Sequence, residues 1–120
     1  MTHCMRLQPV PFEMIKSGAK TIELRLYDEK RRKILIGDGI VFVHTENQNE
    51  TLKVKVIDLH IFDSFDELYD ALPLLECGYT EEDIETASPK DMDLYYSREE
   101  QQKYGVVGIK IRKEEHHDSN

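Results

Sequence analysis

Three charged side chains of complementary chemistry lie close together in the first quarter of the chain. Lys20, Glu23 and Arg25 place an ammonium, a carboxylate and a guanidinium within one short segment. A guanidinium presents planar donors that suit a phosphate or the edge of a base, and a carboxylate accepts hydrogen bonds from amino groups. These side chains are typical of a site for a polar, planar ligand. The alternative is a set of surface charges paired across a sheet, which contributes little energy.

The residues around these charges follow the period of a β-strand. Apolar and polar side chains alternate from Thr21 to Leu26, which predicts one apolar face and one polar face. Glu23 and Arg25 share the polar face, and Tyr27 ends the strand on it. We consider two roles for Tyr27 equally, stacking on a base or closing the mouth of a barrel.

Charge is distributed unevenly along the chain. The net charge is −8, yet residues 16–33 carry seven basic and three acidic residues, a net of +4. Residues 58–100 carry fourteen acidic and two basic residues, a net of −12. Salt limits the reach of exposed charges to about 8–10 Å, so a ligand on the basic segment responds mainly to that segment. Its run Lys30, Arg31, Arg32 and Lys33 is either a solvated loop or a collar for a phosphate backbone.

The remaining pattern predicts an α+β protein built on a small β-barrel. Further strands are expected at residues 5–7, 40–43, 51–62 and 106–112, with a bulge near Ile57 where the alternation changes phase. Between the last two strands the chain is acidic and helical, with Ser64, Ser88 and Ser97 as helix caps. A strand that returns after a helical insert is typical of a sheet that closes on itself. We therefore expect about five or six strands with short helices.

Length and composition restrict the class of protein further. The 120 residues, 39% hydrophobic and 33% charged, fit one domain over residues 1–113 with a disordered polar tail at residues 114–120. No apolar run approaches the roughly 20 residues that cross a bilayer, and no secretory signal begins the chain. We expect a cytoplasmic protein with no membrane partner, with Cys4 and Cys77 as thiols. The His and Cys spacings predict no metal site, and we expect no cofactor.

The segment from Ser17 to Phe42 resembles the opening of the ASCH domain. The family signature GxKxxExR corresponds to Gly18, Lys20, Glu23 and Arg25, and the Gly37-Asp38 turn follows it. The closing "YGVVGIKI" is similar to the family's final strand, and the acidic helices resemble its insert. The resemblance extends from about Met5 to Arg112.

This resemblance implies a fold and two possible functions. It implies a β-barrel related to the PUA domain, with the motif residues lining a cleft beside the barrel and RNA as the expected ligand. Some small bacterial members hydrolyse N4-acetylcytidine with a lysine, a threonine three residues later and a distant glutamate.

The chain departs from the amidase pattern at the threonine, where it has Glu23. Thr21 is on the same strand face and would supply the hydroxyl, and Glu76 lies roughly where the distant glutamate falls. A carboxylate at position 23 is better suited to pair with Lys20 or to act as a base toward water.

Two hypotheses follow from the residues and the resemblance. The first is a module that binds RNA or a modified nucleoside in a basic cleft, through the residues Lys20, Glu23, Arg25, Tyr27, Lys30, Arg31, Arg32 and Lys33. The second is an amidohydrolase acting on an acylated nucleoside, with the candidate catalytic residues Lys20, Glu23, Thr21 and Glu76. Tyr95, Tyr96 and Tyr104 are expected to pack in the core. The oligomeric state is not predicted.

Overall fold

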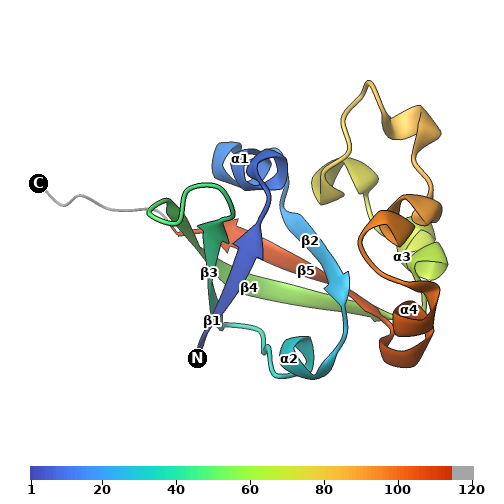
Figure 1. The fold of residues 1–120 in the computed structure, drawn as a ribbon, viewed down its shortest axis with the longest axis horizontal. Helices are drawn as coiled ribbons and strands as arrows, with labels where there is room; N and C mark the ends of the chain where they lie inside the picture. The colour runs from blue at the N-terminus through green and yellow to red at the C-terminus, as the bar shows by residue number, and fades with distance from the viewer. Residues whose placement is uncertain (115–120) are drawn as a thin grey trace, which may run out of the picture.

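The computed structural model describes residues 1–114, whose backbone is organised around one curved five-stranded sheet (Figure 1). The predicted tail, apart from Glu114, lies outside the described residues. β1 pairs with β3 in parallel, whereas the other three strand pairs are antiparallel. The spatial order is β1-β3-β4-β5-β2, so β1 and β2 are the two edges of a half-barrel with an open seam between them. The strands are β1 (Thr2–Leu7), β2 (Ile22–Leu26), β3 (Gly39–His44), β4 (Thr51–Phe62) and β5 (Val106–Lys113).

Short helices lie at the ends of this sheet and beside β2 (Figure 1). The predicted serine caps are present, because Ser64, Ser88 and Ser97 each accept a hydrogen bond from a backbone N–H of the first helical turn. We call residues 74–96, which contain three 3-10 helices, the insert. The helices are α1 (Pro9–Ser17), α2 (Glu29–Arg32), α3 (Phe65–Ala71), η1 (Leu74–Cys77), η2 (Ile84–Thr86), η3 (Pro89–Leu94) and α4 (Arg98–Tyr104).

Five strands in a half-barrel with short helices confirm the predicted α+β class. β4 has the predicted bounds, and its pairing with β5 shifts register between Val56 and Asp58, where the bulge was expected. The basic run, for which a solvated loop was one of two interpretations, instead forms the short helix α2 and its last residue, Lys33, caps that helix. There the side chain of Asp28 accepts the backbone N–H of Arg31 and caps a short helix.

The hydrophobic core has two parts, and β2 lies between them. One part fills the half-barrel with side chains such as Phe12, Phe42 and Ile109. The other packs Ile22, Leu24 and Leu26 of β2 against α3 and the insert, so the predicted apolar face of β2 is confirmed. The polar face of the strand is therefore directed toward the half-barrel and its seam. Within the described residues, no helix combines the length and the apolar character needed to span a bilayer.

Candidate functional site

The end of α1 determines where Lys20 enters the site. Gly18 closes this helix with a backbone φ of +90°, a left-handed conformation that favours glycine. The N–H of Gly18 donates to the carbonyl of Ile15, and the N–H of Lys20 donates to that of Met14 at 3.0 Å. Lys20 is thereby held one turn from α1 and immediately before β2.

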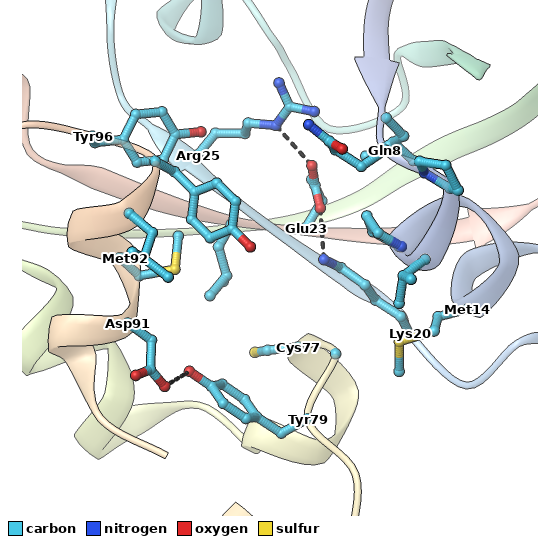
Figure 2. A pocket seen from close by; sticks show the side chains of 18 of the residues that line it. Gln8, Met14, Lys20, Glu23, Arg25, Cys77, Tyr79, Asp91, Met92 and Tyr96 are labelled. Atoms are coloured by element: carbon cyan, nitrogen blue, oxygen red, sulfur yellow. Dashed lines mark hydrogen bonds and ion pairs between the residues drawn. The ribbon is translucent and has the colours of Figure 1, made fainter. Parts of the chain in front are cut away.

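Glu23 brings the three predicted charges together (Figure 2). Lys20 Nζ lies 2.8 Å from Glu23 Oε1, and Arg25 Nε lies 2.7 Å from Glu23 Oε2. Glu23 is only 4% exposed, and the side chains of Lys20 and Arg25 are mostly buried as well. A buried carboxylate is costly unless it is paired, and here each oxygen has its own cationic partner. The surface-charge alternative therefore does not apply to these residues.

Arg25 also connects the two edges of the sheet. Its Nη2 donates to the backbone carbonyl of Arg6, in β1, at 2.8 Å. No backbone pairing joins β1 to β2 among the described residues, so this side chain bridges the seam that the strands leave open. The charged cluster is thus built at the junction of the two edge strands.

A cavity of about 770 Å³ opens onto this cluster. Lys20, Glu23, Leu24 and Arg25 of the β2 segment form part of its lining. The start of α1 forms a second side, and the insert, with Tyr69 of α3, forms the third (Figure 2). Its size lies within the range of about 300–1,000 Å³ that is usual for small-molecule sites. The residues from the α1 side are Arg6, Leu7, Gln8, Pro9, Val10, Pro11 and Met14, and those from the insert are Cys77, Gly78, Tyr79, Asp83, Asp91, Met92, Leu94, Tyr95 and Tyr96.

The electrostatics of the cluster keep Glu23 and Arg25 ionised. Burial by itself would raise the pKa of Glu23, but the charges and hydrogen bonds of Lys20 and Arg25 outweigh it and hold the pKa below its usual value. Burial opposes the charge of Arg25, and Glu23 nevertheless raises the pKa of its guanidinium. Glu23 and Arg25 are therefore fixed charges at neutral pH, and Glu23 is a weak base.

A chain of hydrogen bonds stabilises the insert side of the cavity. The hydroxyl of Tyr79 donates to Asp91 Oδ2 at 2.7 Å, and the hydroxyls of Tyr69 and Tyr79 are 2.6 Å apart. Because the single proton of Tyr79 is committed to Asp91, Tyr69 donates to Tyr79. Burial, followed by these hydrogen bonds, strongly raises the pKa of Tyr79. Burial likewise raises the pKa of the nearby Cys77 thiol to about 11, so this thiol is not a ready nucleophile.

Gly78 at the end of η1 leaves room for the side chain of Lys20. A Cβ at position 78 would lie 3.3 Å from Lys20 Cδ and 3.5 Å from its Nζ. The φ of Gly78 is +113°, a backbone conformation that residues with a side chain rarely adopt. Because position 78 has no side chain, the insert can pack closely against Lys20 and so position its ammonium.

The candidate catalytic residues Thr21 and Glu76 lie outside this cavity. Thr21 Oγ1 donates to Glu76 Oε1 at 2.8 Å, and Lys110 Nζ donates to the same oxygen at 2.9 Å. These hydrogen bonds lower the pKa of Glu76, that from Lys110 most. None of the three residues lines the cavity that contains Lys20, and they connect η1 to β2 and β5 instead.

Tyr27 and the basic run of α2 also lie away from the cavity. Tyr27 lines a second cavity of about 350 Å³, and the guanidinium of Arg32 stacks on its ring at 4.4 Å from the centroid. Lys30 Nζ donates to the carbonyl of Cys4 at 2.9 Å, and Arg31 pairs with Asp28 at 3.2 Å. Lys33 is exposed. The binding roles of these residues remain predictions.

Sequence reasoning missed most of the cavity lining. Tyr96 and Tyr104 pack against the second core cluster as expected, but Tyr95 is 67% exposed at the cavity, so its assignment to the core is wrong. Gln8 and Asp91 occupy positions in a loop and a 3-10 helix, where no periodicity marks the inward side. Leu94 is 85% exposed, and the only feature of the sequence that indicated a role at the site was its position next to two tyrosines.

Fold and site together define an α+β half-barrel protein with a charged cavity at its open seam. The family model of the ASCH domain matches residues 5–115 of the chain. The chain belongs to the ASCH domain family.

Two solved structures are similar to the chain over almost its whole length. The crystal structure of hypothetical protein PH0355 is 37% identical, with a TM-score of 0.78, over 95% of this chain and 100% of that one. The solution NMR structure of protein PF0455 from Pyrococcus furiosus is 34% identical, with a TM-score of 0.69, over 96% of this chain and 99% of that one. No curated protein matched the chain.

Proposed function

We propose that the seam cavity binds the base of a nucleoside, either free or within RNA, and that Lys20, Glu23 and Arg25 read its polar edge. The observation that carries this proposal is the convergence of these three side chains, mostly buried, at one end of a cavity of suitable size. Proteins of the ASCH family generally bind RNA, which supports a ligand of this class. An ion-pair cluster of this kind is costly to bury, and a ligand that uses it explains why it is exposed to a cavity.

The cluster retains unused hydrogen-bonding capacity toward the cavity. Lys20 uses one of its three ammonium protons on Glu23, and no described contact occupies Nη1 of Arg25. Each oxygen of Glu23 accepts one hydrogen bond and keeps a second lone pair. The site therefore offers donors and acceptors side by side, and the amide of Gln8 adds one of each. The Watson–Crick edge of a base presents donors and acceptors in the same way.

The walls of the cavity suit the faces of a planar ring. Tyr95 and Tyr96 line it together with Met92 and Leu24, and Tyr95 is exposed there while the other three side chains also pack in the second core cluster. Stacking of a base on an aromatic side chain contributes about 1–3 kcal/mol. Polar recognition at one end and apolar contact along the sides are the usual composition of a ligand site.

Calorimetric titration with the four ribonucleosides and N4-acetylcytidine tests this proposal. We expect Lys20→Met and Arg25→Met to weaken binding about 10- to 100-fold, the value of a hydrogen bond to a charged group. Lys33→Met is the matched control, because it removes one exposed positive charge that does not line the cavity. Equal affinities in all three variants would exclude this cavity as the binding site.

Hydrolysis of an acylated nucleoside is not favoured by any described contact. Thr21 and Glu76 bond to each other outside the cavity, and Glu23 is a weak base because its pKa is lowered. We expect incubation with N4-acetylcytidine to release no cytidine above the level of the Lys20→Met variant. Release that depends on Lys20 would restore the amidohydrolase hypothesis.

A further inference from the structure

The acidic side chains that line the seam cavity already have partners inside the protein. Glu23 is shared by the two cations of the charged cluster. On the insert, Asp91 accepts a hydrogen bond from the hydroxyl of Tyr79, and Asp83 accepts hydrogen bonds from Thr80. The lining contains three basic and three acidic residues, so its preference for an anion depends on which of these charges are already paired.

Arg6 differs from the other charged residues of the lining, because no hydrogen bond or ion pair of its side chain is described within residues 1–114. β1 buries Met5 and Leu7 on either side of it, so the alternation along the strand directs Arg6 outward, where it is exposed at the cavity. The backbone carbonyl of Arg6 accepts Arg25 Nη2 at 2.8 Å, so the side chain of Arg6 starts beside the charged cluster. Its guanidinium can offer several donors to a ligand.

The start of α1, two residues after Arg6, adds positive potential on this side of the cavity. α1 has nine residues, its N-cap residue Gln8 makes no side-chain capping hydrogen bond, and its first turn contains no acidic residue. The N-terminus of a helix carries a partial positive charge, which no carboxylate of the first turn offsets here. Pro9 and Pro11 line the cavity but have no N–H. α1 therefore contributes mainly a field, and Arg6 supplies the hydrogen-bond donors.

We propose that Arg6 binds a phosphate group of the ligand at the α1 side of the seam cavity, while the cluster of Lys20, Glu23 and Arg25 reads the base. This inference rests on the proposed function, since it concerns the same site, and it names a nucleotide rather than a nucleoside as the ligand. The planar fork of an arginine matches two oxygens of a phosphate. The phosphate belongs either to a free nucleotide or to a phosphodiester of an RNA strand, and both present oxygens of the same kind to a guanidinium.

The exposure of Arg6 determines the expected size of the effect. Exposed ion pairs are weaker than buried ones, so we expect a phosphate-bearing ligand to bind about fivefold more tightly than the matching nucleoside at low salt. Because salt screens this attraction, the gain should shrink as ionic strength rises, while the affinity of the nucleoside stays nearly constant.

The test is a calorimetric comparison of the four ribonucleosides with their phosphate-bearing forms at low and high sodium chloride. The forms are the 5′-monophosphate, the 3′-monophosphate and the homodinucleoside monophosphate, in which a phosphodiester joins two identical nucleosides. The quantity to compare is the ratio of the affinity of each form to that of its nucleoside. A larger gain with the monophosphates indicates a free nucleotide, and a larger gain with the dinucleoside forms indicates a strand.

The variant Arg6→Gln tests the assignment to this residue. We expect the affinity ratio to fall from about five to about one, because the exposed guanidinium is removed. Arg6→Lys keeps the charge without the planar fork and should retain part of the gain. The matched control is Arg112→Gln, since Arg112 is an exposed arginine of β5 that does not line the seam cavity. The ratio in this control should stay as in the wild type.

The outcomes that would contradict the inference differ in what else they contradict. If the phosphate-bearing forms bind no more tightly than nucleosides, or if the gain survives in Arg6→Gln, the inference is wrong while base binding in the cavity stands. Equal falls of the ratio in Arg6→Gln and Arg112→Gln would show a general effect of net charge and would overturn the assignment to Arg6. If neither the nucleosides nor their phosphate-bearing forms bind, both the inference and the proposed function are wrong.

Discussion

At the scale of single residues, Glu23 is the group on which the candidate site depends. It replaces the hydroxyl residue of the amidase pattern, and the structure gives it a different task, to hold two cations in fixed positions. The same alternation that predicted a polar strand face explains why Glu23 and Arg25 converge. Tyr27 lies on the half-barrel side as well, where its ring packs against the core with Arg32 over it, although it lines the second cavity and not the seam cavity.

We predict that Glu23→Gln lowers the free energy of unfolding by about 3–5 kcal/mol, because it leaves two largely buried cations without a carboxylate. Chemical denaturation at pH 7 measures this loss. Glu50→Gln is the matched control, since it breaks an ion pair with Lys16 that is exposed and should stay close to the wild type. Similar losses in the two variants would show that burial of the Glu23 cluster has no special energetic role.

Asp38 gives a prediction for the pH dependence of stability. Hydrogen bonds from His3 and from the backbone N–H of Leu35, with the amino terminus of Met1, lower its pKa from 3.8 to about 2. A carboxylate with a lowered pKa stabilises the fold above its ordinary pKa and loses this effect as the pH falls through the lowered value.

We therefore expect wild-type protein to lose stability between pH 4 and about 2, and Asp38→Asn to lose less over that window. The variant should also be less stable at neutral pH, where the wild-type carboxylate is ionised. Urea unfolding at a series of pH values measures both effects. Parallel curves for the two proteins would contradict the assignment to Asp38.

At the scale of elements, the site is made by the insert as much as by β2. The boundaries of β4 and the serine caps were predictable, because alternation and capping are local properties of the sequence. The η1 helix and the side of the insert that faces the cavity were not, because short 3-10 turns carry no long periodicity. Their orientation comes from tertiary contacts such as the Tyr69–Tyr79–Asp91 chain.

We predict that Gly78→Ala weakens nucleoside binding by displacing Lys20, in addition to straining the backbone. Gly37→Ala is the matched control, since its φ of +98° imposes comparable strain but no atom lies within 4 Å of the added Cβ. Both variants should lose about 1–2 kcal/mol of stability. Only Gly78→Ala should lose affinity, and equal affinity in the two variants would exclude a role of Gly78 in positioning Lys20.

At the scale of the whole molecule, the fold separates the charged cluster of Lys20, Glu23 and Arg25 from the basic run of α2, although the two are adjacent in the sequence. The strand order leaves a seam between β1 and β2, and side chains of Arg25 and Lys30 cross to carbonyls of β1. The seam cavity takes the charged cluster, whereas the basic run lies with α2 near the second cavity. Strand alternation predicts which side chains share a face, but it does not give the order of strands in the sheet, so this division was not predictable.

The most direct test of base binding at the seam is a titration of 15N-labelled protein with the four ribonucleosides, followed by the backbone amide signals. We predict shifts that saturate together and are concentrated at residues 20–25, 77–79 and 91–96, the segments from β2 and the insert that line the cavity. Lys20→Met should greatly reduce them. Saturating shifts confined to α2 and the second cavity, or no shifts with any nucleoside, would contradict binding at the seam.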